Sequence, residues 1–135
     1  MLSLGMDIGT STVKLVLLRD GAMAKQWMAV HHGRPFACLK KGLSALELDA
    51  DTPFSLCVTG SNTEALLEQD SAIPSLGDIP AVVEGVRQIV PQAGSVIEIG
   101  SQGARFITDL QSRAPQFAVN EHCAGGTGSL FEDQM

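Results

Sequence analysis

The sequence contains no tyrosine, and aromatic residues make up only 4% of the chain. A hydrophobic core therefore has to be built from the aliphatic part of the 44% of residues that are apolar, chiefly Val, Leu, Ile and Ala. The length of 135 residues allows one sizeable core but is short for an enzyme with two full lobes. This composition is typical of an α/β domain.

Positive charge is also scarce. Nine Lys and Arg residues stand against 15 Asp and Glu residues, which gives a net charge of -6, and the basic residues form no run. A surface that binds nucleic acid neutralises phosphates with clustered Lys and Arg. The sequence therefore argues against nucleic acid as a partner.

Long apolar runs are missing as well. No stretch approaches the roughly 18 to 20 apolar residues that span a bilayer. The N-terminus also lacks the charged region and apolar core of a signal peptide. We expect a cytoplasmic protein with no membrane partner.

The three cysteines, Cys38, Cys57 and Cys123, fit neither a disulfide framework nor a Cys-X-X-Cys zinc site. Cys38 lies in a helical pattern and Cys57 in the apolar run FSLCV, so both are predicted to be small buried side chains. Cys123 lies among glycines before a predicted helix, whose dipole favours a thiolate suited to metal ligation or nucleophilic attack. One thiolate cannot hold an iron-sulfur cluster, which takes about four ligands, so a partner would have to supply the others.

Strand and helix signals alternate along the chain. Apolar runs separated by short turns predict a three-stranded antiparallel meander over residues 2–8, 12–18 and 22–30, and further strands over 54–58, 95–99, 104–110 and 116–119. Helical spacing of apolar residues predicts helices over 35–48, 63–69 and 78–90. We expect an α/β fold in which residues 1–93 form a first lobe and residues 94–135 the start of a second, truncated lobe.

The beginning of the chain recurs near residue 100. GMDIGTSTVKLVLL, from residue 5, and IEIGSQGARFITDL, from residue 97, share an acid, Ile-Gly, a small polar turn and a basic residue in an apolar strand. A repeated β-meander is a strong signal of organisation, although it does not by itself define any chemistry.

The loop DIGTST of the first copy is the strongest candidate site. Gly9 permits close approach of the backbone, and a nest of backbone N–H groups attracts anions such as phosphate. The hydroxyls that can converge on the same phosphate oxygens belong to Thr10, Ser11 and Thr12. An ordinary hairpin, whose aspartate accepts hydrogen bonds from the turn, is the alternative. The second copy of the pattern favours the phosphate interpretation.

Two charged residues flank this loop. Asp7 would repel a phosphate directly, but it can hold a hydrated Mg²⁺ or orient the attacking water. Lys14 points to the same side of its strand as Thr12 and could offset phosphate charge.

The second hairpin is a weaker candidate. Its turn, formed by Gly100, Ser101 and Gln102, could clasp phosphates from the opposite side but lacks a run of hydroxyls. Arg105 is the counterpart of Lys14 and equally suits a solvated strand position.

Two further segments are open to two interpretations. The loop of residues 59–62 lies between a strand and a helix, where phosphate groups often bind, but a plain connection is as consistent with its sequence. His31 and His32 end the third predicted strand, and adjacent strand residues point to opposite faces, so they do not easily share a metal ion. We expect both histidines at the surface.

The order of these motifs resembles that of one protein family. GMDIGTSTVKLVLL, VTGS, VIEIGSQGARFI and FAVNEHCAGGTGSLFEDQM are similar to the N-terminal portion of the activator ATPases of 2-hydroxyacyl-CoA dehydratases and benzoyl-CoA reductases. The resemblance runs through essentially all 135 residues, and CAGGTG after an IEIG hairpin is its most specific element. It implies an actin-like ATPase (ribonuclease H-like) lobe followed by the first meander of a second lobe.

The resemblance also implies cofactors and partners. The first hairpin would be the phosphate-1 motif and the second the phosphate-2 motif, which bind ATP or ADP with Mg²⁺. Cys123 would ligate a 4Fe-4S cluster held between two protomers of a homodimer, and ATP hydrolysis would drive electron transfer to a CoA-ester dehydratase or reductase. Ser101 and Gly103 depart from the family pattern, where a Gly and an acid are usual, and the missing acid bears on how Mg²⁺ is handled.

We therefore expect the N-terminal part of an ATP-dependent iron-sulfur activator. We expect residues 1–135 alone to bind and hydrolyse nucleotide weakly, because preorganised charge stabilisation needs both lobes. One alternative is a lobe of a small-molecule kinase, such as a sugar or acetate kinase, which has no use for Cys123. The other is a non-catalytic interaction module whose exposed sheet edge recruits another chain.

Overall fold

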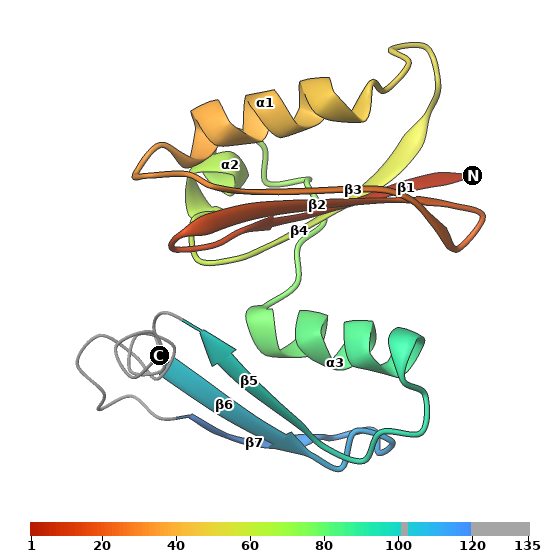
Figure 1. The fold of residues 1–135 in the computed structure, drawn as a ribbon, viewed down its shortest axis with the longest axis vertical. Coiled ribbons are helices and arrows are strands. Elements are labelled where there is room, and N and C mark those ends of the chain that lie inside the picture. Colours follow the sequence, from red (N-terminus) through yellow and green to blue (C-terminus); the bar gives the residue numbers. More distant parts are fainter. Residues whose placement is uncertain (101–102, 120–135) are drawn as a thin grey trace. The chain divides into compact units, whose positions relative to one another are not determined.

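The computed structural model describes residues 1–100 and 103–119, which belong to two compact units (Figure 1). The first unit is Met1–Asp78, and the second begins at Ile79. The lobe boundary after residue 93 remains a prediction. None of the described helices is long and apolar enough to cross a membrane.

The first unit contains a four-stranded sheet. Its strands are β1 (Leu2–Ile8), β2 (Thr12–Arg19), β3 (Ala22–Val30) and β4 (Phe54–Thr59), in the spatial order β3-β2-β1-β4. The first three form the predicted antiparallel meander, and β4 runs parallel to β1. Asp20 and Gly21, with φ of 51° and 82°, make the two-residue turn between β2 and β3, a conformation that Asp-Gly favours. The predicted meander is thereby confirmed.

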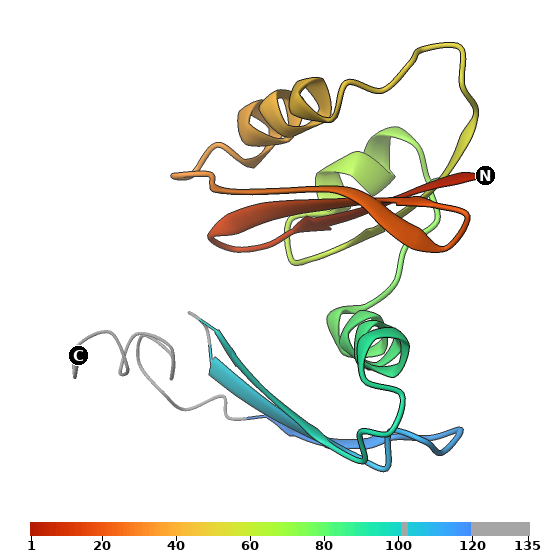
Figure 2. The ribbon, with the colours of Figure 1, turned by 45° about the vertical axis from the view of Figure 1, so that its right-hand side comes forward.

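Helices cover one face of this sheet. α1 (Pro35–Leu46) and α2 (Glu64–Gln69) lie on the same side of the strands (Figures 1 and 2). Every second residue of β1 is buried beneath them, because side chains of a strand alternate between the two faces. Gly42 lets α1 approach closely, since a Cβ there would lie 2.5 Å from Trp27 Cε3. The buried core consists of Leu2, Leu4, Met6, Ile8, Val13, Leu15, Leu17, Cys38, Leu39, Leu46 and Val58.

Both described cysteines are free thiols, and they differ in burial. Cys38 is buried in the core, as predicted. The prediction that Cys57 is buried is wrong: Cys57 on β4 is only partly buried, because it lies on the face of the sheet away from α1.

The second unit is built around a three-stranded antiparallel sheet. Its strands β5 (Val96–Gly100), β6 (Gly103–Thr108) and β7 (Gln116–Val119) are neighbours in that order. α3 (Asp78–Ile89) packs on one face through a small core of Val83, Ile107 and Leu110.

The repeated sequence pattern has the same strand register in both units. Asp7 pairs with Lys14 across β1 and β2, and Glu98 pairs with Arg105 across β5 and β6. The covered faces differ, however. In the first unit the helices pack on the face opposite the acid-base pair, whereas α3 packs on the face that carries the pair. Consequently Ile97, Ile99 and Phe106 of the second sheet are exposed.

Candidate functional site

The turn between β1 and β2 is narrow and open on its outer side. Gly9 N donates to the carbonyl oxygen of Thr12 at 2.9 Å and closes the turn. Thr10 and Ser11 are exposed, whereas Thr12 is half-buried as the first residue of β2. The turn therefore carries small hydroxyl residues at one end of the sheet, as a phosphate-binding loop requires.

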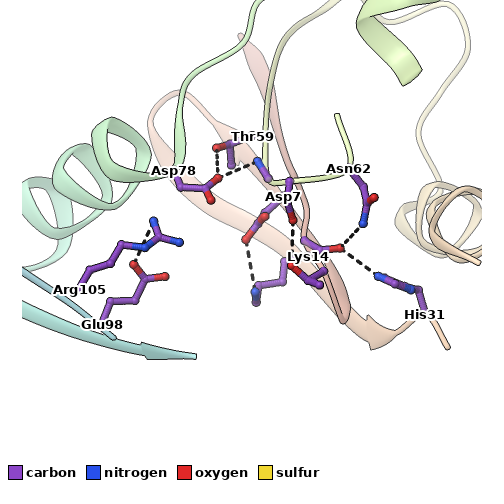
Figure 3. A network of polar contacts seen from close by, with 12 residues as sticks. Asp7, Lys14, His31, Thr59, Asn62, Asp78, Glu98 and Arg105 are labelled. Atoms are coloured by element: carbon purple, nitrogen blue, oxygen red, sulfur yellow. Dashed lines mark hydrogen bonds and ion pairs between the residues drawn. The ribbon is translucent and has the colours of Figure 1, made fainter. Parts of the chain in front are cut away.

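The two charged residues predicted beside this turn face each other. Lys14 Nζ donates to Asp7 Oδ2 at 3.3 Å (Figure 3), and the side chains are 48% and 37% exposed. An ion pair at such exposure contributes little to stability, about 0 to 1 kcal/mol. Its main effect is electrostatic and local. Because Lys14 neutralises the Asp7 carboxylate, that carboxylate repels an incoming anion less than it would alone.

A second loop lies beside the turn. Because β4 runs parallel to β1, the two strands end at the same edge of the sheet, where Asp7 is in register with Thr59. Asn62 N donates to Ile8 O at 2.9 Å, and the Thr10 and Ser61 hydroxyls are 3.0 Å apart. The segment of residues 59–62, here called the β4 loop, is thus bonded to the hairpin.

Gly60 makes this close approach possible. Its φ of +106° is one that L side chains rarely adopt, and a Cβ would lie 2.4 Å from Ile8 O. Asp78 Oδ1 accepts hydrogen bonds from Gly60 N at 3.1 Å and from Thr59 Oγ1 at 3.4 Å. Thr63 Oγ1 donates to Gly60 O at 2.9 Å, so the backbone of Gly60 is bonded at both its N–H and its C=O.

The prediction that both histidines lie at the surface is wrong for His31. His31 is 7% exposed, and its backbone N donates to Ser11 O at 3.0 Å, which draws the end of β3 beneath the turn. Its Nε2 is 2.9 Å from Gly9 O, and Gly33 N donates to its Nδ1 at 3.1 Å. His32 is exposed as predicted.

The second hairpin is described only in part. Gly100 ends β5, and Glu98 Oε2 lies 3.5 Å from Arg105 Nη1, an ion pair without hydrogen-bond geometry. Arg105 is therefore the structural counterpart of Lys14, as predicted. Ser101, Gln102 and Cys123, which were predicted to bind phosphate and an iron-sulfur cluster, lie outside the described residues.

Two residues beside the turn, His31 and Asp78, were not predicted as part of the site. Asn62 lies in the loop of residues 59–62, for which phosphate binding was one of two predicted interpretations. All three side chains bond to backbone groups of the turn or of the β4 loop. The arrangement holds an open, hydroxyl-bearing turn in one conformation, which suits binding of a phosphate group.

Comparison with known proteins identifies relatives of this chain. No protein-family model matches it. It is 31% identical over 137 residues to the activator of lactoyl-CoA dehydratase of Anaerotignum propionicum, an alignment that covers 98% of this chain and 52% of that protein. The chain spans about half the length of the curated relatives that it matches.

Two solved structures have the same fold. One is component A of the (R)-2-hydroxyglutaryl-CoA dehydratase of Acidaminococcus fermentans, with a TM-score of 0.78 and 22% identity over 98% of this chain and 52% of that one. The other is the activator of the 2-hydroxyisocaproyl-CoA dehydratase from Clostridium difficile with bound ADPNP, with a TM-score of 0.75 and 25% identity over 92% of this chain and 47% of that one. The chain is homologous to the activators of 2-hydroxyacyl-CoA dehydratases, and it has the fold of an actin-like ATPase N-terminal lobe followed by a second small antiparallel sheet.

Proposed function

We propose that this chain is the N-terminal, nucleotide-binding part of an ATP-dependent iron-sulfur activator that drives electron transfer to a 2-hydroxyacyl-CoA dehydratase-type enzyme. The observation that carries this proposal is the β1-β2 turn, a Gly-Thr-Ser turn in which Thr10 and Ser11 are exposed and which the β4 loop holds from one side. A solved relative with this fold holds ADPNP, an ATP analogue, which supports nucleotide as the ligand.

The turn would bind nucleotide through its phosphates. The backbone N–H groups of residues 10–12 and the hydroxyls of Thr10, Ser11 and Thr12 would donate to phosphate oxygens, since the Gly9 N–H already closes the turn. Asp7, at the end of β1, would hold Mg²⁺ through a water molecule, since a hard cation with phosphate ligands usually keeps part of its hydration shell. Lys14 would compensate the negative charge that Asp7 brings close to the phosphates.

The remaining assignments rest on sequence resemblance alone. Gly100, Ser101 and Gln102 would contact the phosphates as a second motif, and Cys123 would be a ligand of a 4Fe-4S cluster shared between two protomers. Such a cluster supplies a carrier for single electrons. The organic chemistry would belong to the CoA-ester dehydratase or reductase that receives the electron.

Nucleotide binding is tested by following backbone amide resonances during titration with Mg-ADPNP. We expect weak binding with shifts concentrated at residues 9–12, because the chain spans only half of its relatives. The Asp20-Gly21 turn at the other end of β2 is the internal control and should not shift. No shift at residues 9–12 at millimolar Mg-ADPNP would contradict the nucleotide assignment.

The cluster assignment is tested separately. The protein is purified without oxygen, reconstituted with iron and sulfide, and compared with the Cys123→Ser and Cys57→Ser variants by iron and sulfide analysis and by electron paramagnetic resonance of the reduced sample. We expect cluster signals in the wild type and in Cys57→Ser but not in Cys123→Ser. Equal iron and sulfide in all three proteins would contradict ligation by Cys123, and a lobe of a small-molecule kinase would then be the better description.

A further inference from the structure

We propose that Asn62 and His31 are positioning residues that fix the orientation of the Gly9-Thr10 peptide for phosphate binding. Asn62 Nδ2 donates to the carbonyl oxygen of Gly9 at 2.8 Å, and His31 Nε2 lies 2.9 Å from the same oxygen. Figure 3 shows the two side chains converging on this carbonyl. One comes from the β4 loop and the other from the end of β3, so the contact joins three separate parts of the first unit. This role rests on the proposed nucleotide function.

The hydrogen bonds of His31 define which ring nitrogen carries the proton. Gly33 N, which can only donate, bonds to Nδ1 at 3.1 Å. Nδ1 therefore acts as the acceptor, and Nε2 carries the hydrogen that is donated to Gly9 O. His31 is buried, which limits competition from water for these two bonds. The imidazole thus acts here as a fixed donor towards the turn.

Two donors occupy the acceptor capacity of the Gly9 carbonyl, which has two lone pairs. Gly9 has no Cβ, so its backbone can adopt several conformations. Local sterics alone therefore do not fix the plane of the Gly9-Thr10 peptide. A trans peptide points its N–H in the direction opposite to its C=O. Holding Gly9 O towards Asn62 and His31 therefore points Thr10 N–H away from them.

Asn62 is itself held in place by the backbone. Its N–H donates to Ile8 O at 2.9 Å, and Gly60 lets the β4 loop approach the end of β1. Asp78 fixes the other end of the loop through Gly60 N. Because these bonds form during folding, the turn is already ordered before a ligand arrives, and less conformational entropy is lost on binding.

The role is tested by measuring the dissociation constant for Mg-ADPNP in Asn62→Ala and His31→Phe by amide resonance titration. Each variant removes one donor to Gly9 O. We expect the dissociation constant to rise by about tenfold, because the free energy of one hydrogen bond corresponds to about that change. The Thr10 amide resonance should shift in the nucleotide-free variants, which reports on the orientation of the peptide itself. His31→Gln should restore most of the affinity, because a glutamine amide places a donor at about the position of the imidazole Nε2.

The matched control is Gln111→Ala. Gln111 Nε2 also donates to backbone carbonyls, those of Pro91 and Ala93 at 2.7 and 2.8 Å, but it belongs to the second unit. We expect its affinity for Mg-ADPNP to equal that of the wild type. Thermal unfolding of each variant identifies any that are not folded at the titration temperature. If Asn62→Ala or His31→Phe is unfolded, the affinity of the other variant or of His31→Gln tests the positioning role.

The outcomes separate the two proposals. If the wild type binds at residues 9–12 and Asn62→Ala and His31→Phe bind equally well, the positioning role is wrong while the nucleotide function stands. If the wild type itself gives no shift there, the nucleotide function fails and the positioning role fails with it. Loss of affinity in Gln111→Ala as large as in Asn62→Ala would show that the effect is general destabilisation, which also overturns the positioning role.

Discussion

Asp7 and Lys14 lie directly opposite each other on β1 and β2 and form an ion pair of 3.3 Å beside the candidate phosphate turn. The second sheet repeats the relationship with Glu98 and Arg105, at 3.5 Å. The repeat in the amino-acid sequence is therefore a repeat of a cross-strand acid-base pair, and in both copies Ile-Gly follows the acid.

Removal of the Lys14 charge should affect ligand binding more than stability. In Lys14→Gln the Asp7 carboxylate is left without its cation, and it will repel a phosphate at the turn. We expect binding of Mg-ADPNP to weaken severalfold and its dependence on salt concentration to change, while the free energy of unfolding changes by less than about 1 kcal/mol. The measurements are titration at two ionic strengths and urea unfolding.

Lys25→Gln is the control for this charge change. Lys25 also pairs with a carboxylate, that of Glu47 at 3.9 Å, but on the edge strand β3 away from the turn. An equal loss of affinity in both lysine variants would indicate an effect of net charge alone.

Gly60→Ala should be strongly destabilising. The new Cβ would combine a φ of +106° with a distance of 2.4 Å to Ile8 O, a backbone atom that cannot move aside easily. We expect a loss of about 3 kcal/mol in the free energy of unfolding. Gly21→Ala, which has a φ of +82° but no atom within 4 Å of the new Cβ, should lose only about 1 kcal/mol. Equal losses in urea unfolding would show that the close approach of the β4 loop contributes nothing.

Gly42→Ala tests the packing of α1 on the sheet. A Cβ there would lie 2.5 Å from the Trp27 ring and 2.7 Å from Leu15 Cδ1, so either the helix or these two side chains must shift. We expect destabilisation by about 1 to 3 kcal/mol together with a changed Trp27 fluorescence. Gly85→Ala, in α3 with open space around the new Cβ, should instead be neutral or stabilising by about 0.5 to 1 kcal/mol. The opposite order of the two variants in chemical unfolding would contradict this packing.

Neighbouring residues on β6 should differ in their contribution to stability. Ile107 is fully buried against α3, whereas Phe106 points to the other face and is 46% exposed. We expect Ile107→Ala to lose about 2 to 4 kcal/mol and Phe106→Ala less than about 1 kcal/mol, as followed by circular dichroism during urea unfolding. Equal losses would mean that the exposed face of the second sheet is covered in solution.

The strands and helices could be predicted from the sequence because their signals are local. Alternation of apolar residues in β1 and the Asp-Gly turn after β2 predict the meander, and the predicted boundaries agree with the structure to within a few residues. The face of the second sheet that α3 covers could not be predicted, since both faces of β5 and β6 carry apolar residues.

The contacts of His31 and Asn62 with the turn could not be predicted, because they join residues that are far apart in the sequence. Asn62 and Gly9 are 53 residues apart, and His31 and Gly9 are 22 apart. A hydrogen bond from a side chain to a distant backbone carbonyl leaves no periodic pattern in the sequence. His31 was expected at the surface because histidine is often partly exposed, and only the fold shows that the turn lies over it.

The most direct test of the central claim is paramagnetic broadening by Mn²⁺ bound with ADPNP. With Mn-ADPNP added, the account predicts that the amide resonances of Gly9, Thr10 and Ser11 broaden first. The Asp20-Gly21 turn, at the other end of the eight-residue strand β2 and about 30 Å away along the chain, should keep its line widths. Mn²⁺ without nucleotide serves as the reference for binding of the ion to exposed carboxylates. Unchanged line widths at Gly9, Thr10 and Ser11, or equal broadening at both turns, would contradict the claim that this hairpin binds the phosphates of a metal-nucleotide complex.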